Sequence, residues 1–292
     1  MLIDLSYPIH TGMGVYPNDP PVIISDASGP KSGRCHISRV DFGTHTGTHI
    51  DMPFHFIPEG QTADVFPLGN CMGQGFLIEK EYREGPLLTL SADELTGMPE
   101  GAVFVLYTHW QERYGGEDFF TEYPALTIEA AELLLEKGVR AIAMDTPSID
   151  NRYTNGELHK LVLGRGVAII ETLANLDRLA AAQQDEAAVI GKTAADGKWT
   201  AGDNTATIGK TADDGKWAAG GNTATIGKTA DDGKWTAGGN IVTNSNAADN
   251  EESGAGGKLA VCGKTRGFFL CAAPLKLAGG DGSPVRAFAL TE

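Results

Sequence analysis

An 18-residue unit, repeated three times, occupies much of the second half of this chain. The copies begin at Ile190, Ile208 and Ile226 and each contains one tryptophan, a pattern that indicates a tandem repeat. One tryptophan and one or two aliphatic side chains bury too little apolar surface for a unit to fold alone. Alternating β-formers before a DDG or ADG turn predict weak hairpins. The copies therefore pack on one another, pack on the rest of the chain, or stay partly disordered.

Neither the repeat nor the composition indicates a nucleotide or nucleic-acid site. The Gly-Lys-Thr triplets of the repeat lack the earlier glycine of a phosphate-binding loop. A net charge of −15 argues against nucleic acid and anionic membranes as partners. No apolar run approaches the roughly 18 residues of a membrane span, and the N-terminus lacks a signal-peptide pattern. The cysteines form no CxxC pair, which favours free thiols and a soluble cytoplasmic protein; they are Cys35, Cys71, Cys262 and Cys271.

The segment His45–Phe56, HTGTHIDMPFHF, holds three of the 7 histidines of the chain and one aspartate. Imidazole and carboxylate are ligands of zinc, manganese and iron. Glycine, proline and β-branched residues argue against a helix here. In a straight strand His45 and His49 would lie about 13 Å apart, too far for one ion. Because Gly47 permits a bend, we predict a bent, extended segment that gathers its histidines and Asp51 around a metal.

Other segments predict a mixed α/β fold. Residues 73–80 and 101–109 are apolar runs of strand length, and residues 140–150 predict a buried strand that continues into a polar loop. Residues 127–139 predict a helix that Thr127 caps and Gly138 ends. Further strands or apolar runs are expected within residues 4–9, 21–27, 166–176 and 268–290.

These residues together resemble the metal-dependent cyclase family, which includes bacterial kynurenine formamidases and isatin hydrolases. The histidine-rich segment matches the family signature HxGTHxDxPxH, and similar matches are DLSYPIHTGMGVYPNDPPV, AMDTPSID, HKLVLGRGVAIIETLANL and PLKLAGGDGSPVRAFAL. The resemblance implies one α/β domain, residues 1–179 plus 266–292, with strands around a metal pocket and helices outside. Residues 180–265 would be a repeat segment inserted into a surface loop, which is tolerable because loop-closure entropy grows slowly with length.

The resemblance also implies roles for individual residues. His45, His49 and Asp51 would bind one divalent ion, and His159 and Glu171 would complete the site, with Asp51 or Glu171 bridging to a second ion. Zinc is the first expectation and manganese the alternative, because nitrogen and oxygen ligands suit both. Without the resemblance, His159 would be interpreted as a helix-end residue and Glu171 as a solvated charge.

The activity implied is hydrolysis of the C–N bond of a small amide. A divalent metal lowers the pKa of bound water and polarises a carbonyl, and His55 would act as the general acid/base that protonates the leaving amine. The first interpretation is an arylformamidase of tryptophan catabolism that acts on N-formylkynurenine. The chain carries Tyr16 where bacterial formamidases have a tryptophan, and this ring could stack on an aromatic substrate.

Two other interpretations remain open. One is an isatin hydrolase-like enzyme, or another hydrolase of cyclic amides or lactones. The other is a repeat-based binding module whose metal site is structural; such sites close every coordination position with protein ligands, whereas catalytic sites leave positions open. A serine hydrolase is disfavoured because the chain has no GxSxG motif. The resemblance further implies a homo-oligomer, either a dimer or a tetramer.

Overall fold

A computed structural model describes residues 1–27, 35–183 and 267–291, together with the backbone of six strands between residues 199 and 243. Contacts divide the chain into two compact units: Met1–Ala181 with Arg266–Glu292, and Ala182–Thr265. No helix among the described residues is long and apolar enough to cross a membrane. Cys35, Cys71 and Cys271 are free thiols, whereas Cys262 lies outside the described residues.

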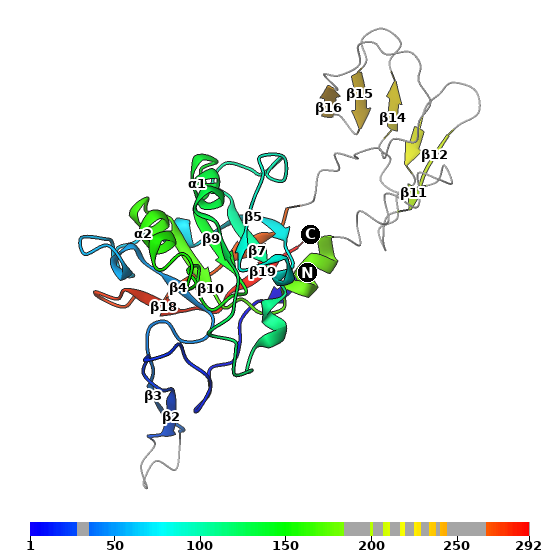
Figure 1. Ribbon diagram of the computed structural model, residues 1–292. Coiled ribbons are helices and arrows are strands. Elements are labelled where there is room, and N and C mark those ends of the chain that lie inside the picture. Colours follow the sequence, from blue (N-terminus) through cyan, green and yellow to red (C-terminus); the bar gives the residue numbers. More distant parts are fainter. Residues whose placement is uncertain are drawn as a thin grey trace. The chain divides into compact units, whose positions relative to one another are not determined.

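A mixed, curled sheet forms the centre of the first unit, in the strand order β1-β19-β17-β5-β7-β9-β10-β4-β18 (Figure 1). Its four central strands run parallel and read as nearly continuous apolar runs, which is typical of strands that are covered on both faces. They are β5 (Met72–Glu79), β7 (Val103–Tyr107), β9 (Ala141–Met144) and β10 (Ala168–Glu171).

Antiparallel strands extend this sheet on both sides. On one side lie β17 (Phe269–Cys271), β19 (Phe288–Leu290) and β1 (Leu2–Asp4), so that the two ends of the chain pair with each other. On the other side β4 (His49–Asp51) lies between β10 and β18 (Gly282–Pro284). The histidine-rich segment is therefore built into the sheet beside a strand from the far C-terminal part of the chain.

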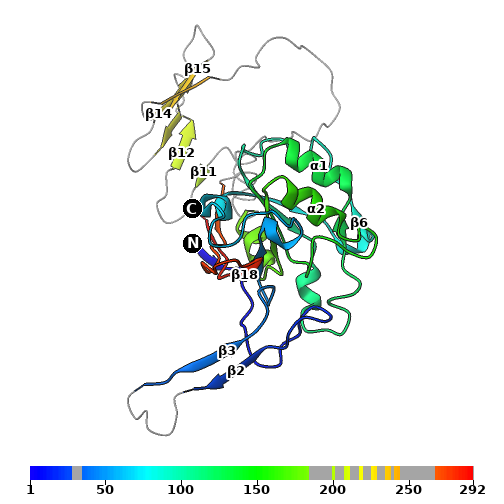
Figure 2. The ribbon, with the colours of Figure 1, turned by 90° about the vertical axis from the view of Figure 1, so that its left-hand side faces the viewer.

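Two helices, α1 (Ile128–Glu136) and α2 (Glu157–Gly164), lie side by side over one face of the sheet (Figures 1 and 2). The hydroxyl of Thr127 accepts a hydrogen bond from the Ala130 backbone N–H and caps α1, and Gly138 follows the helix in the left-handed region. The core between helices and sheet consists of large apolar side chains that include Phe104, Leu106, Leu134, Ile142, Leu158, Val162 and Ile169.

Shorter elements complete the first unit. The antiparallel pair of β2 (Ile23–Asp26) and β3 (Ser38–Asp41) projects away from the sheet, as Figure 2 shows. A small parallel pair joins β6 (Leu87–Leu88) to β8 (Ala125–Leu126). Single 3-10 turns are η1 (Pro53–His55), η2 (Leu68–Cys71), η3 (Tyr82–Glu84) and η4 (Trp110–Arg113).

The second unit contains an antiparallel sheet in which six strands follow one another in chain order. Its strands are β11 (Trp199–Thr200), β12 (Thr207–Lys210), β13 (Trp217–Ala219), β14 (Thr225–Lys228), β15 (Lys234–Ala237) and β16 (Asn240–Thr243). The side chains of the repeat lie outside the described residues, as does the GKT motif of its first copy.

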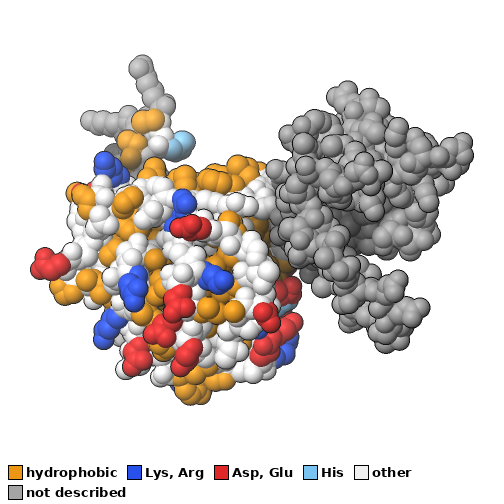
Figure 3. Space-filling model, turned by 90° about the horizontal axis from the view of Figure 1, so that it is seen from above, with side chains coloured by type: hydrophobic (Ala, Val, Ile, Leu, Met, Phe, Trp, Pro, Cys, Tyr) orange, Lys and Arg blue, Asp and Glu red, His pale blue; other side chains and the backbone are white. Residues whose placement is uncertain are grey.

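Charged side chains of both signs are mixed on one face of the described surface. On the face shown in Figure 3, acidic and basic groups are interspersed among apolar ones, and no continuous basic area joins the described residues of this face. Nucleic-acid binding relies on clustered Lys and Arg. This face offers no such cluster.

Most of the strand and helix predictions are confirmed, with one clear correction. The helix and the strands within residues 21–27, 73–80, 101–109 and 140–150 are present. The strand expected over residues 4–9 is wrong: β1 covers Leu2–Asp4 and pairs with β19. Beyond the strand, the Tyr7 backbone N–H donates to the Thr48 hydroxyl at 3.0 Å and not to β19.

Candidate metal centre

The pairing of β4 with β10 builds the middle of the site. His49 and Asp51 flank Ile50, which is fully buried, so the two polar side chains share the opposite face of the strand. In the register of the two strands His49 lies directly across from Glu171, the last residue of β10. Gly47 has a φ of 62°, and this left-handed turn brings His45 back beside Asp51, with 2.7 Å between Nδ1 and Oδ1. The predicted bend at Gly47 is confirmed.

His159 reaches the same point from the first turn of α2. Asp150, at the end of the loop after β9, accepts hydrogen bonds from the backbone N–H groups of Leu158 (3.1 Å) and His159 (2.8 Å). Its carboxylate also lies 2.6 Å from Nδ1 of the His159 ring. One buried aspartate therefore caps the helix and sets the direction of the imidazole. Asp150 lies in the motif AMDTPSID, but the sequence analysis gave it no role.

Two imidazoles and two carboxylates face one another at the centre. Nε2 of His49 lies 3.4 Å from Asp51 Oδ1 and 3.3 Å from Glu171 Oε2. Nε2 of His159 lies 3.5 Å from Asp51 Oδ2 and also 3.5 Å from Glu171 Oε1. Each carboxylate thus directs one oxygen toward each imidazole. Ligands of a tetrahedral ion with bonds of about 2.0–2.1 Å lie about 3.3 Å apart, which is close to these separations.

One buried atom of this cluster, Oδ2 of Asp51, forms no hydrogen bond with the described part of the chain. A buried carboxylate oxygen left unpaired is costly. A divalent cation among the facing nitrogens and oxygens would satisfy it, so the donor set fits a metal. Donor atoms lie within 4.8 Å of one another in three overlapping groups: His45, His49 and Asp51; Asp51, His55 and His159; His45, His55 and Asp281.

Protonation of the cluster follows from its carboxylates. Burial alone would lower the pKa of His45, but the negative charges of Asp51 and Asp281 raise it to about 10. Burial also opposes the charged forms of His49 and His159, yet the facing carboxylates keep both pKa values above the ordinary value. Although burial favours protonated carboxyl groups, the same contacts lower the pKa of Asp51 and Glu171. The three imidazoles therefore carry protons in the absence of a metal, and binding of a cation would release them.

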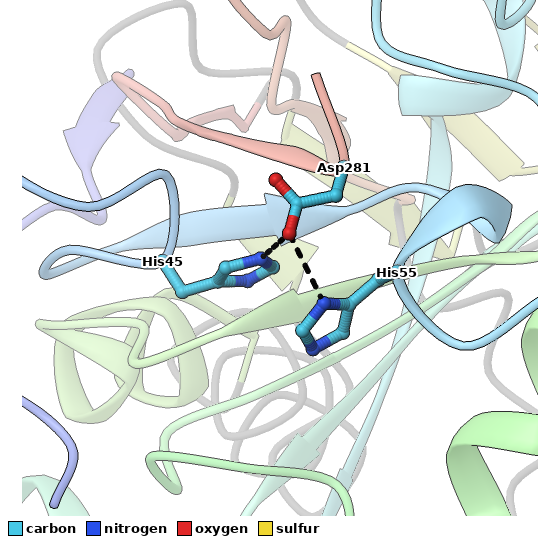
Figure 4. A group of neighbouring side chains, drawn as sticks. All are labelled: His45, His55 and Asp281. Carbon is cyan, nitrogen blue, oxygen red and sulfur yellow. Dashed lines mark hydrogen bonds and ion pairs between the residues drawn. The ribbon is translucent and has the colours of Figure 1, made fainter. Parts of the chain in front are cut away.

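His55 differs from the other three imidazoles. Burial lowers its pKa below the ordinary value, and the charge of Asp51 offsets this only in part. The residue lies at the end of η1, and its Nδ1 is 3.4 Å from Oδ2 of Asp281. The same carboxylate oxygen lies 3.1 Å from His45 Nε2, so Asp281 stands between two histidines (Figure 4). Asp281 was not predicted as a site residue, although its GGDGSPV context belongs to a segment that resembles the family.

A cavity of about 480 Å³ opens onto these groups, a size that suits a small-molecule ligand. Six of the seven predicted site residues line it: Tyr16, His45, His49, His55, His159 and Glu171. The seventh, Asp51, is fully buried beneath them. The alternative interpretation of Glu171 as a solvated charge is wrong, because its side chain is buried. His159 does lie at a helix end, in the first turn of α2, but its side chain is also buried.

Aromatic side chains also line the cavity, among them Tyr16, Phe120 and Tyr123, and we call them the aromatic wall. The hydroxyl of Tyr16 lies 3.0 Å from that of Tyr123, and Tyr123 donates to the backbone carbonyl of Asp150 at 2.8 Å. The ring of Tyr16 meets Phe120 edge to face, with 6.1 Å between centroids. Tyr16 is therefore held at both its ring and its hydroxyl, in a wall that can contact a flat apolar group.

Comparison with known proteins gives a consistent result. The profile of the family described as putative cyclase matches residues 3–151, which is more than half of the chain. The kynurenine formamidase of Bacillus cereus (strain ATCC 10987) is 30% identical over 199 residues, covering 67% of this chain and 92% of the relative.

Two solved structures share the fold. Isatin hydrolase A from Labrenzia aggregata, bound to benzyl benzoate, has a TM-score of 0.62 at 19% identity and covers 100% of this chain and 94% of its own. A potential metal-dependent hydrolase with cyclase activity has a TM-score of 0.58 at 20% identity, covering 100% of this chain and 98% of its own. The sequence match and the shared fold agree, and this chain belongs to the putative cyclase family.

Proposed function

We propose that this protein is a metal-dependent hydrolase that cleaves the C–N bond of a small aryl formamide, with N-formylkynurenine as the first candidate substrate. The observation that carries the proposal is the convergence of His49, Asp51, His159 and Glu171 around the unpaired Oδ2 of Asp51, on the floor of the cavity. Kinship with kynurenine formamidase supports the choice of substrate. Likeness to isatin hydrolase supports only the fold, so isatin serves as the comparison substrate.

The residues that would hold the metal form two sets that share both carboxylates. His45, His49 and the two carboxylates would make the first set, and His159 with the same carboxylates would make the second. Zinc is the ion that we propose, with manganese as the alternative, since all donors are nitrogen or oxygen. A bound divalent ion would supply acidified water and polarisation of the amide carbonyl.

Other side chains would handle the proton and the substrate. His55 lies beside the ligands, and its lowered pKa leaves it neutral near pH 7, so it can accept a proton from water and pass it to the leaving amine. Tyr16 and Phe120, which also line the cavity, would contact the aryl ring of the substrate. The cavity thus offers both a group for proton transfer and aromatic side chains, as an aryl amide requires.

The decisive experiment is the hydrolysis of N-formyl-L-kynurenine by purified protein after chelation and after reloading with zinc or manganese. Turnover that chelator abolishes and metal restores is expected, and isatin should react more slowly. The matched control pair is His159→Ala, expected to be inactive, and His10→Ala, an exposed histidine outside the cavity, expected to be active. Lack of turnover with either metal would reject the formamidase proposal.

We also propose that residues 180–265 are an insert in a single cyclase-like domain. The division of contacts at Ala181 and Arg266 supports this. Deletion of residues 180–265 should leave metal binding and turnover intact, whereas a repeat-based binding protein would lose its function. Homo-oligomerisation is likewise a proposal, and light scattering of the deletion variant and of the full chain would show both the assembly and any effect of the insert on it.

A further inference from the structure

Asp281 is fixed to both ends of the metal-ligand segment. Its Oδ1 accepts a hydrogen bond from the Thr44 hydroxyl at 2.8 Å, directly before His45. Its backbone carbonyl accepts from the Met52 N–H at 2.9 Å, directly after Asp51. The pairing of β18 with β4, in which Gly282 lies opposite Asp51, sets this position. The carboxylate is partly exposed, but its place relative to the histidines is determined from both sides.

The close fit continues at the next residue. A Cβ atom on Gly282 would lie 2.7 Å from Cε1 of the His45 ring and 3.0 Å from the Ile50 carbonyl oxygen. The 2.7 Å contact is shorter than Cβ atoms make in proteins, so any side chain at residue 282 would displace the His45 ring. The turn of residues 281 and 282 therefore both contacts His45 through a carboxylate and leaves room for its ring.

His45 has a carboxylate oxygen at each ring nitrogen. Nδ1 lies 2.7 Å from Asp51 Oδ1, and Nε2 lies 3.1 Å from Asp281 Oδ2. A neutral imidazole has one N–H donor and one lone pair. If the lone pair of Nδ1 is directed at a cation held with His49 and Asp51, the single proton must stand on Nε2, where Asp281 accepts it. This arrangement, a ligand imidazole whose other nitrogen donates to a carboxylate, fixes the tautomer and the ring direction.

The same oxygen of Asp281 lies 3.4 Å from Nδ1 of His55. Figure 4 shows the carboxylate between the two rings, with the other nitrogen of His55 directed away from it. We propose that Asp281 is a positioning residue that acts through two histidines at once: it selects Nδ1 of His45 as the metal-binding nitrogen and turns Nε2 of His55 toward the cavity. This inference rests on the proposed metal site but not on the identity of the substrate.

The test compares Asp281→Asn with a matched control, Asp64→Asn. Asp64 accepts hydrogen bonds from the Gly279 N–H and the Thr62 hydroxyl, so it supports the same turn without contacting a histidine. Zinc affinity is measured by competition with a chromogenic chelator. Asp281→Asn should bind zinc about 10–100-fold more weakly with unchanged stoichiometry, and Asp281→Glu should recover part of the loss. Asp64→Asn should match the wild type.

A second measurement reports the tautomer directly. In ¹⁵N–¹H correlation spectra of the zinc-loaded protein, His45, assigned by loss of its signals in His45→Ala, should carry its proton on Nε2. Asp281→Asn should populate both tautomers. At saturating zinc the same variant should lose kcat by up to about a hundredfold through the misdirected His55, with KM nearly unchanged.

Three outcomes would overturn the inference. If Asp281→Asn has the same zinc affinity and the same His45 tautomer as the wild type, the carboxylate positions neither histidine. Loss of a whole equivalent of zinc would make Asp281 a ligand instead. Absence of zinc binding in the wild type would overturn both this inference and the proposed function. By contrast, a wild type that binds zinc but leaves N-formyl-L-kynurenine intact would reject the substrate and leave the role of Asp281 standing.

Discussion

The four imidazoles of the site form two pairs that are held in different ways. Nδ1 of His49 lies 2.8 Å from the Gly47 carbonyl, and Nδ1 of His159 lies 2.6 Å from Asp150. Both side chains are only 5–6% exposed. In the other pair, His45 and His55 are 17% and 27% exposed and share one carboxylate, which is itself 37% exposed.

This difference matches the two tasks that we propose for the histidines, metal binding and proton transfer. A buried imidazole with one nitrogen fixed to a separate acceptor can present only its other nitrogen, as a metal ligand must. An imidazole that exchanges protons with substrate needs access to the cavity and a pKa low enough for it to release its proton. His55 meets that description, since burial lowers its pKa while those of the other three are raised. His45 lies in the outer pair, but its raised pKa groups it with the proposed ligands His49 and His159.

The largest effect is expected from the inner pair. His159→Ala removes the only imidazole of the described residues that faces the second oxygens of both Asp51 and Glu171. We expect loss of bound metal and activity at background level, measured by metal analysis after gel filtration and by turnover. Full metal content with normal turnover would show that the inner pair is not the ligand pair.

His55→Ala should separate the two tasks. General acid–base groups contribute roughly 10²–10⁴-fold to rate, so kcat should fall by that order while the metal content stays at the wild-type level. The same metal analysis and turnover assay check this. If metal and activity disappear together, His55 is a ligand and the division between the pairs fails.

Asp150→Asn tests how the inner pair is held. The change keeps the shape of the side chain but weakens its hold on His159 and on the start of α2. Loss of such a supporting carboxylate typically costs about 10–100-fold in metal affinity. Chelator competition should show that decrease with stoichiometry preserved, and Glu157→Gln, which changes an exposed carboxylate on the same helix, should show none.

Without metal, the cluster should make stability depend on pH. The pKa of His45 rises from 6.5 to about 10 on folding, so its stabilising contribution is complete below pH 6.5 and is lost as the pH rises toward 10. The melting temperature of chelated protein should therefore fall between pH 6.5 and 9.5, and His45→Gln should flatten the curve. Zinc-loaded protein should not show this decrease, because its ligands are already deprotonated. Equal slopes with and without zinc would contradict the assignment.

The smallest effect is expected on the aromatic wall. Tyr16→Phe removes the hydrogen bond to the Tyr123 hydroxyl, worth about 1 kcal/mol or roughly a fivefold change. We expect that decrease in kcat/KM, mainly through KM, since the ring stays but is held less firmly. Tyr82→Phe, outside the cavity, is the control. A kcat loss as large as that of His55→Ala would place Tyr16 in the chemistry.

Local patterns were enough to predict much of this molecule. Thr127 and Gly138 bound α1 as the capping rules require, because helix ends depend on hydrogen bonds within a few residues. The bend at Gly47 also followed from local geometry, since a straight strand would separate His45 from His49. The first strand was misplaced, because β1 is defined by its pairing with β19 at the opposite end of the chain.

The roles proposed for the site residues remain predictions. Part of the reason why these residues lie together is local sequence, and part is tertiary structure. The residue types and spacing of HTGTHIDMPFHF, and the resemblance that they carry, determined which side chains can bind a metal and that they must gather. Only the tertiary structure decided what holds them, since Asp150 lies on a loop after β9 and Asp281 precedes a strand more than 200 residues beyond His45. Carboxylates are common along the chain, and a carboxylate gains such a role only through long-range strand pairing and helix docking, which no local pattern encodes.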